Sequence, residues 1–122
     1  MNTIEITGGT KQQRDLVQVC VEHAIQELMP RMRTLDIEIN LLDIKGDATG
    51  WCSMRDNNRE FEIEVDRKQG LFAIASTVLH EMVHIKQYAR NEINGVDMVW
   101  KGQPVPNNTD YSDLPWEVEA YR

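Results

Sequence analysis

One long segment limits what this chain of 122 residues can fold into. Residues 71–94 contain neither Pro nor Gly, and Asn94 followed by Gly95 is a natural place for a helix to stop. The first half of the segment is strongly apolar, which is typical of a helix of about twenty residues that packs into a core. The segment is too short and too charged to cross a membrane. The sequence therefore predicts a domain built around one buried helix.

The middle of this helix carries His80, Glu81 and His84 in the order His-Glu-Met-Val-His. Residues four apart on a helix share a face, so both imidazoles can point at one spot, as ligands of a tetrahedral Zn²⁺ do. Glu81 lies beside that face, where a carboxylate can accept a proton from a metal-bound water. Polar groups in a buried helix are costly unless they are paired or coordinate something. The pattern predicts two zinc ligands and a general base; two hydrogen-bonded core histidines without a metal are the alternative.

Size and composition predict one globular domain over residues 1–122. The net charge of −7 argues against nucleic acid or an anionic membrane as the main partner, and it is compatible with a peptide or protein substrate. The N-terminus has neither a basic region nor an apolar run of signal-peptide length, so we expect a cytoplasmic protein. Cys20 and Cys52 lack ligand-type spacing, and we expect both to be reduced. Nothing in the sequence predicts the oligomeric state.

The periodicity of apolar residues predicts the elements around the buried helix. A first helix is expected over residues 10–29, with Thr10 as its N-cap and Pro30 at its end. Alternating apolar and polar residues predict strands, two of them joined by a hairpin turn at Asn57 and Asn58. The predicted strands cover residues 35–41, 51–55, 60–66 and, as a short piece, 96–100.

The end of the chain and the order of elements indicate the fold class. Residues 102–110 read as an irregular loop, and residues 114–121 read as the start of a short last helix with Pro early in it. Because the strands come before the long helix without βαβ alternation, we expect an α+β fold with a mainly antiparallel sheet of three to four strands.

The strand over residues 60–66 has one apolar face and one acidic face. The acidic face is either a solvated sheet surface, the commoner arrangement, or a surface that holds a basic peptide. A sheet edge beside the buried helix could bind an extended peptide by strand addition. We expect such a peptide along residues 61–65, or along whichever strand forms the edge.

A catalytic zinc site needs a third protein ligand. Glu92 lies about three turns past His80 on the same helix, too far to converge with it. His23 reads as a partly buried histidine of the first helix. Glu117 and Glu119 are better placed, because a separate helix can approach the ion from the side; being two residues apart, only one of them can face it. The other carboxylates after the motif are Asp97, Asp110 and Asp113. Asp110 or Asp113 could also accept a hydrogen bond that orients a ligand imidazole, although both are more naturally turn or cap residues.

Four further residues are candidates for the site. Stabilisation of an oxyanion usually needs a hydrogen-bond donor beside the metal. Tyr88, Tyr111 and Tyr121 could be that donor or could support a ligand, although tyrosines near a core are more often packing residues. Cys52 could approach the metal, but a lone cysteine on a strand is usually a small core residue.

These residues also resemble a known family. His-Glu-Met-Val-His on a buried helix, followed by a Glu on a later helix, is similar to the gluzincin branch of zinc metallopeptidases, above all to minimal members encoded by phages and bacteria. Several of those carry a ligand Glu followed three residues later by Ala, as Glu117 and Ala120 do here. Residues 115–120 and 86–88 are also similar to the phage-type members.

The resemblance implies a minimal zincin-like domain that hydrolyses peptide bonds. In it His80, His84 and Glu117 would hold Zn²⁺ and Glu81 would be the base, with Glu119 as the alternative ligand. The rival hypothesis is a catalytically inactive zinc-binding module that serves folding or partner recognition. Structural zinc sites close the fourth position with protein, whereas catalytic sites keep it for water. The surroundings of that fourth position therefore separate the two hypotheses.

Overall fold

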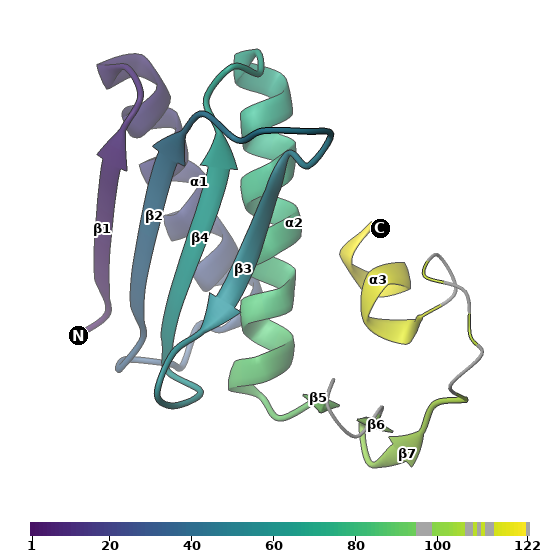
Figure 1. Cartoon of the computed structure of the whole chain (residues 1–122). Helices are drawn as coiled ribbons and strands as arrows, with labels where there is room; N and C mark the ends of the chain where they lie inside the picture. Colours follow the sequence, from purple (N-terminus) through teal and green to yellow (C-terminus); the bar gives the residue numbers. More distant parts are fainter. Residues whose placement is uncertain (95–98, 107–108, 110, 112–113, 122) are drawn as a thin grey trace.

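A four-stranded sheet carrying two helices on one face forms the main body of the protein (Figure 1). The computed structural model describes residues 1–94, 99–106, 109, 111 and 114–121. The elements are β1 (Thr3–Gly8), α1 (Lys11–Leu28), β2 (Asp36–Leu42), β3 (Gly50–Met54), β4 (Glu60–Asp66), α2 (Leu71–Ala89), β5 (Ile93–Asn94), β6 (Val99–Trp100), β7 (Gln103–Pro104) and α3 (Pro115–Ala120).

The strand order in the main sheet is β1-β2-β4-β3. β1, β2 and β4 are mutually parallel, and only β3 is antiparallel to its neighbour. The mixture of helices and sheet confirms the α+β expectation at that level, but the prediction of a mainly antiparallel sheet is wrong. One cause is β4, which pairs with β2 in parallel and so lies between β2 and β3. The other is β1, which was missed in the sequence although Ile4 and Ile6 alternate with polar residues. Because α1 leads the chain back across the sheet, β1 and β2 run parallel.

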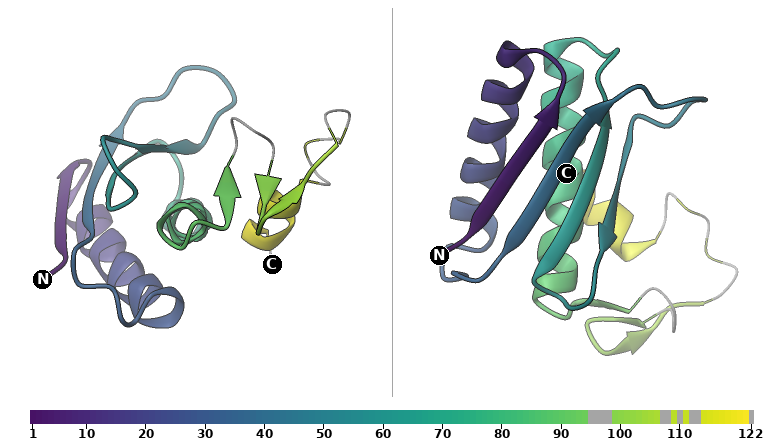
Figure 2. Two further views of the ribbon diagram at one scale, coloured as in Figure 1. Left: turned by 90° about the horizontal axis from the view of Figure 1, so that it is seen from below. Right: turned by 60° about the vertical axis from the view of Figure 1, so that its left-hand side comes forward.

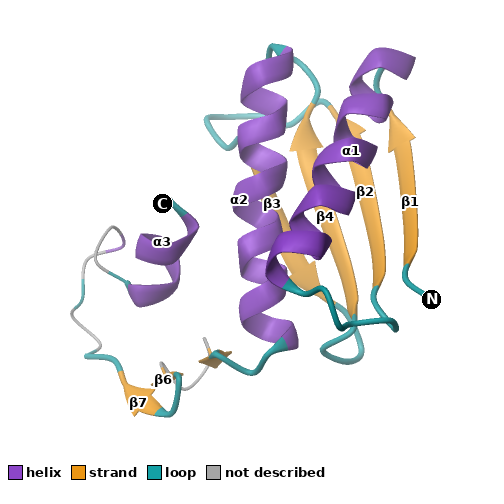
Figure 3. Cartoon of the chain, turned by 180° about the vertical axis from the view of Figure 1, so that it is seen from behind, coloured by secondary structure: helices purple, strands orange, loops and turns teal. Residues whose placement is uncertain are grey.

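The core lies between the helices and one face of the sheet. Figure 3 shows α1 and α2 side by side on this face. Alternate residues of the strands and one stripe of each helix meet there, as the periods of the two structures require. The side chains that are almost fully buried in this layer include Val17, Val21, Ile37, Ile39, Phe61, Ile63, Ile74, Val78, Met82 and Ile85.

The opposite face of the sheet is polar and carries no helix. Glu60, Glu62 and Glu64 lie on it, half-buried among neighbouring strands. Glu62 accepts a hydrogen bond from Asn40 and lies 3.7 Å from the guanidinium of Arg55. None of the three glutamates lines the cleft described below. This arrangement is that of a solvated sheet surface, the commoner of the two expectations.

The predicted first helix is confirmed. Thr10 is its N-cap and forms a capping box with Gln13, and the helix ends at Leu28, just before Pro30. The predicted hairpin is also present, because β3 and β4 are antiparallel neighbours joined through Asn57 and Asn58.

The long helix begins at Leu71 as predicted but ends at Ala89, before the expected stop at Asn94 and Gly95. Asn91 adopts a positive φ of 57° directly after the helix, a conformation that Asn tolerates better than most residues. The amide of Glu92 then donates to the carbonyl of Gln87 over 2.8 Å, and the amide of Asn91 donates to Tyr88 over 3.1 Å. These bonds form a Schellman motif that terminates the helix with Asn in the place of Gly.

A small second sheet leads from α2 to α3. β5, β6 and β7 pair in that order, each antiparallel to the next. The predicted strand over residues 96–100 is confirmed at Val99 and Trp100, and residues 96–98 lie outside the described residues. The expectation of an irregular loop over residues 102–110 is wrong at β7, which pairs with β6. In the part of the chain that the structure describes, no helix is long and apolar enough to cross a bilayer.

The short helix α3 is present as predicted, with Pro115 in its first turn. Figure 2 shows α3 beside α2, on the side away from α1. Trp116 and Ala120 are buried, and the indole of Trp116 lies 6.4 Å from that of Trp100. The second sheet and α2 thus hold α3 alongside the middle of the long helix.

Candidate metal centre

The long helix α2 presents different chemistry on two of its sides. Val78, Met82 and Ile85 are fully buried in the core. His80 and His84 are half-buried, and their rings meet edge to face with centroids 4.9 Å apart. The four-residue spacing therefore does bring both imidazoles to one spot on a single face, as expected for a helix.

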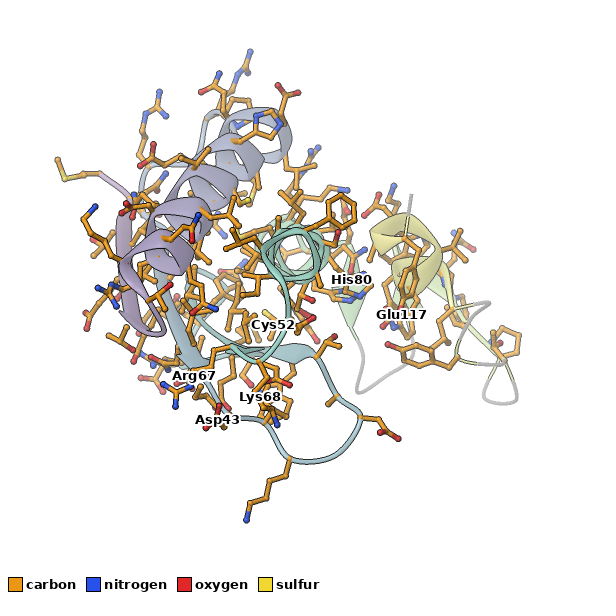
Figure 4. The ribbon with its side chains drawn as sticks, turned by 90° about the horizontal axis from the view of Figure 1, so that it is seen from above. Asp43, Cys52, Arg67, Lys68, His80 and Glu117 are labelled. Atoms are coloured by element: carbon orange, nitrogen blue, oxygen red, sulfur yellow. The ribbon has the colours of Figure 1, made fainter. Side chains whose placement is uncertain are left out.

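Glu117 of α3 completes a group of three with these histidines. Its Oε1 atom lies 3.4 Å from Nε2 of His80 and 3.2 Å from Nε2 of His84. Figure 4 shows His80 and Glu117 close together in the space between the two helices. Two atoms that each bind a tetrahedral zinc at its usual N or O distance are about 3.3 Å apart. The distance of Glu117 from each imidazole nitrogen thus fits one zinc ion, and all three ligand atoms lie within 4.8 Å of one another.

The environment of the Glu117 carboxylate favours a cation. Glu117 is 6 % exposed, and its Oε1 has no hydrogen-bond partner among the described residues. A buried carboxylate oxygen without a partner costs free energy, which a bound cation offsets. Burial and the neighbouring His84 lower the pKa of His80, outweighing the opposite effects of Glu117 and the backbone of Ala120. Because a proton on His80 is disfavoured, the donor set of two imidazoles and one carboxylate fits a metal such as zinc better.

Glu81 follows His80 on α2 and is 6 % exposed. Burial raises the pKa of its carboxyl group; the neighbouring His84 acts against this rise, and the charge of Glu117 adds to it. Glu81 lines the same cleft as the three ligand candidates. A carboxylate with a raised pKa beside a metal site is a better proton acceptor than one in water.

The group opens onto a cleft of about 1010 Å³. Its walls come from the loop before β3, from β3 itself, from α2 and from α3. Gly50 allows the close approach of two of these walls, because a Cβ atom there would lie 2.7 Å from the side chain of Thr77 and from the carbonyl oxygen of Glu64. The residues of the loop and of β3 that line the cleft are Asp47, Ala48, Thr49, Gly50, Trp51 and Cys52.

All three candidate tyrosines line this cleft, in different settings. Tyr88 is half-buried, and its ring lies 6.4 Å from that of Phe61 in the core. The ring of Tyr121 lies 4.4 Å from the ring of His80. Burial and the charge of Glu117 raise the pKa of Tyr111 to about 12. The Tyr111 hydroxyl therefore stays a hydrogen-bond donor at physiological pH.

The other ligand candidates lie away from the group. Glu119 accepts hydrogen bonds from Lys86 over 2.8 Å and from Gln87 over 3.0 Å. Although its burial acts in the opposite direction, these bonds hold the pKa of Glu119 below its usual range. Glu92 pairs with Lys86 at 2.8 Å. Contrary to the expectation of a partly buried side chain, His23 is exposed on α1.

Cys52 and the three aspartates complete this comparison. The thiol of Cys52 is buried on β3 near Glu81, and its pKa is raised by burial and by the charge of Glu81. It is not a member of the metal-binding group. Asp97, Asp110 and Asp113 lie outside the described residues.

Lys86 and Gln87 are the residues near the site whose roles the sequence reading missed. The side-chain oxygen of Gln87 lies 2.8 Å from Nδ1 of His84, its amide nitrogen donates to the backbone of Trp116, and Lys86 pairs with Glu119. A signal was present in the sequence, because these two polar residues follow a ligand histidine on the next turn of an apolar helix. Their partners on α3 could not be identified without the tertiary structure.

In comparisons with known proteins, the chain matches no family model, no characterised protein sequence and no solved structure. What the site can do is therefore inferred from its geometry and its donor chemistry.

Proposed function

We propose that this protein is a zinc-dependent peptidase of the gluzincin type with a minimal zincin-like fold. His80, His84 and Glu117 hold the ion, and Glu81 is the general base. The observation that carries the proposal is the buried Oε1 of Glu117, which lacks a hydrogen-bond partner and lies at zinc-ligand spacing from two imidazole nitrogens. Glu81, the residue after His80 on the same helix, adds a carboxylate that can act as a base. With it, the group has the parts of a hydrolytic site as well as those of a metal-binding site.

The chain's own residues divide the chemistry between them. Held by His80, His84 and Glu117, a zinc ion would supply a Lewis acid that makes water easier to deprotonate. Glu81 takes the proton of the water that attacks the scissile carbonyl, and then passes it to the leaving amine. Tyr111, whose pKa is raised by burial and by the charge of Glu117, is the tyrosine best placed to orient that ligand, and Tyr121 covers one side of His80.

The proposed substrate is a peptide in extended form, bound along β3. The expectation that it lies along residues 61–65 is wrong, because β4 is paired on both sides, with β2 and with β3. β3 is the last strand in the order and lines the cleft, so its free edge can pair with a peptide backbone. Strand addition there would lay a scissile carbonyl beside His80 and His84.

The same geometry bears on the inactive zinc module. Within the described residues the metal-binding group has three members, with no fourth His, Cys, Asp or Glu. The group also faces a cleft rather than a closed core. An open fourth position supports a catalytic site over a structural one.

The cysteines and the net charge bear on the compartment and on the class of substrate. Cys20 and Cys52 are free thiols, which agrees with a reducing compartment such as the cytoplasm. The net charge of −7 favours a peptide or protein substrate over nucleic acid.

Glu81→Gln tests the proposed function. The variant keeps the size of the side chain but cannot accept a proton, so cleavage of a mixed peptide library should fall by about 10²–10⁴-fold while zinc stays stoichiometric. Peptide products are measured by mass spectrometry and zinc by elemental analysis. Glu27→Gln, on the exposed surface of α1, is the matched control and should cleave like the wild type. Equal cleavage by Glu81→Gln rules out the base, and a zinc-loaded wild type that cleaves nothing favours the inactive module.

A further inference from the structure

Gln87 is a fully buried polar side chain that touches both helices of the proposed site. It is 0 % exposed. Its Oε1 lies 2.8 Å from Nδ1 of His84, on the side of the ring away from Glu117. Its Nε2 donates to the carbonyl oxygen of Trp116 over 2.8 Å and to Oε1 of Glu119 over 3.0 Å. One amide group thus links a ligand histidine of α2 to the backbone of α3.

The partners on α3 fix which way this amide points. The carbonyl of Trp116 can only accept hydrogen bonds. The carboxylate of Glu119 also accepts from Lys86 over 2.8 Å, an ion pair that keeps it charged and without a proton to donate. With two acceptors on that side, the NH₂ group of Gln87 must face α3. Its oxygen must then face His84.

The orientation of the amide in turn determines the imidazole of His84. An oxygen 2.8 Å from Nδ1 requires a proton on that nitrogen, because two lone pairs would otherwise face each other. With Nδ1 protonated, Nε2 is the nitrogen free to bind a metal. This is the nitrogen that lies 3.2 Å from Glu117.

We infer that Gln87 is a positioning residue that holds the Nδ1 proton of His84 and at the same time docks the helix carrying Glu117. The inference rests on the proposed metal site and extends it: the two ligands from α2 and α3 are aligned by one shared side chain. Lys86 supports the arrangement, since its ammonium pairs with Glu119 and with Glu92, each at 2.8 Å. Outer groups that orient a ligand histidine in this way commonly contribute 10–100-fold to metal affinity.

The first test reads the proton itself, in metal-free protein. Long-range ¹H–¹⁵N correlation spectra of the His84 imidazole should show a slowly exchanging proton on Nδ1. Gln87→Leu removes the acceptor at similar volume, so this protection should be lost. Gln26→Leu makes the same exchange on the exposed surface of α1 and should leave the His84 signals unchanged. A wild-type His84 without a protected Nδ1 proton overturns the inference.

The second test measures zinc affinity by competition with a chelating dye. Gln87→Leu should weaken zinc binding by about 10–100-fold. Gln87→Glu retains an acceptor for His84 but sets a carboxylate against that of Glu119. Glu119→Gln leaves one amide oxygen for two donors, the ammonium of Lys86 and the NH₂ group of Gln87, and sets its own NH₂ group against one of them. The double variant restores a donor–acceptor pair with reversed polarity, and should bind zinc at least about tenfold more tightly than the product of the single effects predicts. A merely space-filling role for Gln87 would give strictly additive losses, and additivity would contradict the inference.

Failure of the inference and failure of the peptidase proposal give different results. One outcome is that the Nδ1 proton of His84 is protected and the zinc affinities of the Gln87 and Glu119 variants are non-additive, while the zinc-loaded protein cleaves no peptide. In that case Gln87 keeps its role and the peptidase proposal is excluded. If the wild type cleaves peptides but Gln87→Leu retains full zinc affinity, the peptidase stands and the role of Gln87 is refuted.

Discussion

At the scale of single residues, Glu81 shows how the proposed chemistry acts against the stability of the fold. Its carboxyl group is almost fully buried and has a raised pKa, chiefly because burial disfavours the charged form. A group whose pKa is higher in the folded state binds more protons there than in the unfolded chain. Its stabilising contribution is therefore complete below the usual carboxyl pKa of 4.5, and it is lost as the pH rises through the raised value.

At neutral pH the ionised Glu81 should therefore destabilise the metal-free protein. Glu81→Gln removes the charge, so we expect the melting temperature at pH 7 in the presence of a chelator to rise by a few degrees. For a domain of this size, about 1 kcal/mol corresponds to roughly 3–6 °C. The gain should shrink as the pH falls toward 4.5, where the wild-type carboxyl is protonated as well. Thermal melts across this range check the sign; Glu27→Gln is the control, and a lower melting temperature for Glu81→Gln at pH 7 would refute the account.

At the scale of elements, α3 separates two carboxylates that the sequence leaves as alternatives. Glu117 faces the histidines of α2, whereas Glu119 pairs with Lys86 and Gln87. Residues two apart on a helix point in nearly opposite directions, so one turn of α3 serves two purposes. Glu117 is the proposed ligand, and Glu119 attaches the helix that carries it.

The two carboxylates should therefore respond to truncation in opposite ways. Glu117→Ala should reduce zinc affinity by more than about a hundredfold, since losing a ligand exceeds losing a supporting group. In metal-free protein it should cost little stability, because Oε1 has no hydrogen-bond partner to lose. Glu119→Ala should reduce zinc affinity by only about tenfold. It should destabilise the metal-free fold by roughly 1–3 kcal/mol, because buried donors lose their acceptor.

Dye competition for zinc and urea unfolding in chelator provide the two measurements. The stronger loss of zinc affinity in Glu119→Ala would move the third ligand to Glu119. Equal effects of both variants on unfolding would contradict the division of roles between the two sides of α3.

At the scale of the whole molecule, local patterns in the sequence predicted most elements but not their arrangement. Thr10 and Pro30 delimit α1 by local chemistry, and the apolar segment that begins at Leu71 defines α2. The parallel pairs of the sheet were not predicted, because β1 was missed and because the place of β4 between β2 and β3 depends on contacts distant in sequence. The end of α2 was predicted too late in the chain. Helices commonly stop at a Gly with positive φ, so Gly95 was taken as the stop, but Asn91 adopts a positive φ four residues earlier.

The candidate site also combines features that a local sequence pattern predicts with features that depend on tertiary structure. The pairing of His80 with His84 follows from helical periodicity alone, so a five-residue pattern was enough to predict it. Glu117 was chosen over Glu119 by resemblance, since which side of α3 meets α2 is a tertiary property. The role of Gln87 depends on hydrogen bonds to residues about thirty positions away in the sequence, which no local pattern encodes.

The most direct test of the central claim is a crystal structure of the zinc-loaded protein with anomalous data at the zinc edge. The account predicts one zinc ion bound by Nε2 of His80, Nε2 of His84 and a carboxylate oxygen of Glu117, each at about 2.0–2.2 Å, with water in the fourth position. Glu81 should lie beside that water. A fourth protein ligand on the ion, or a zinc peak away from these three residues, would contradict it.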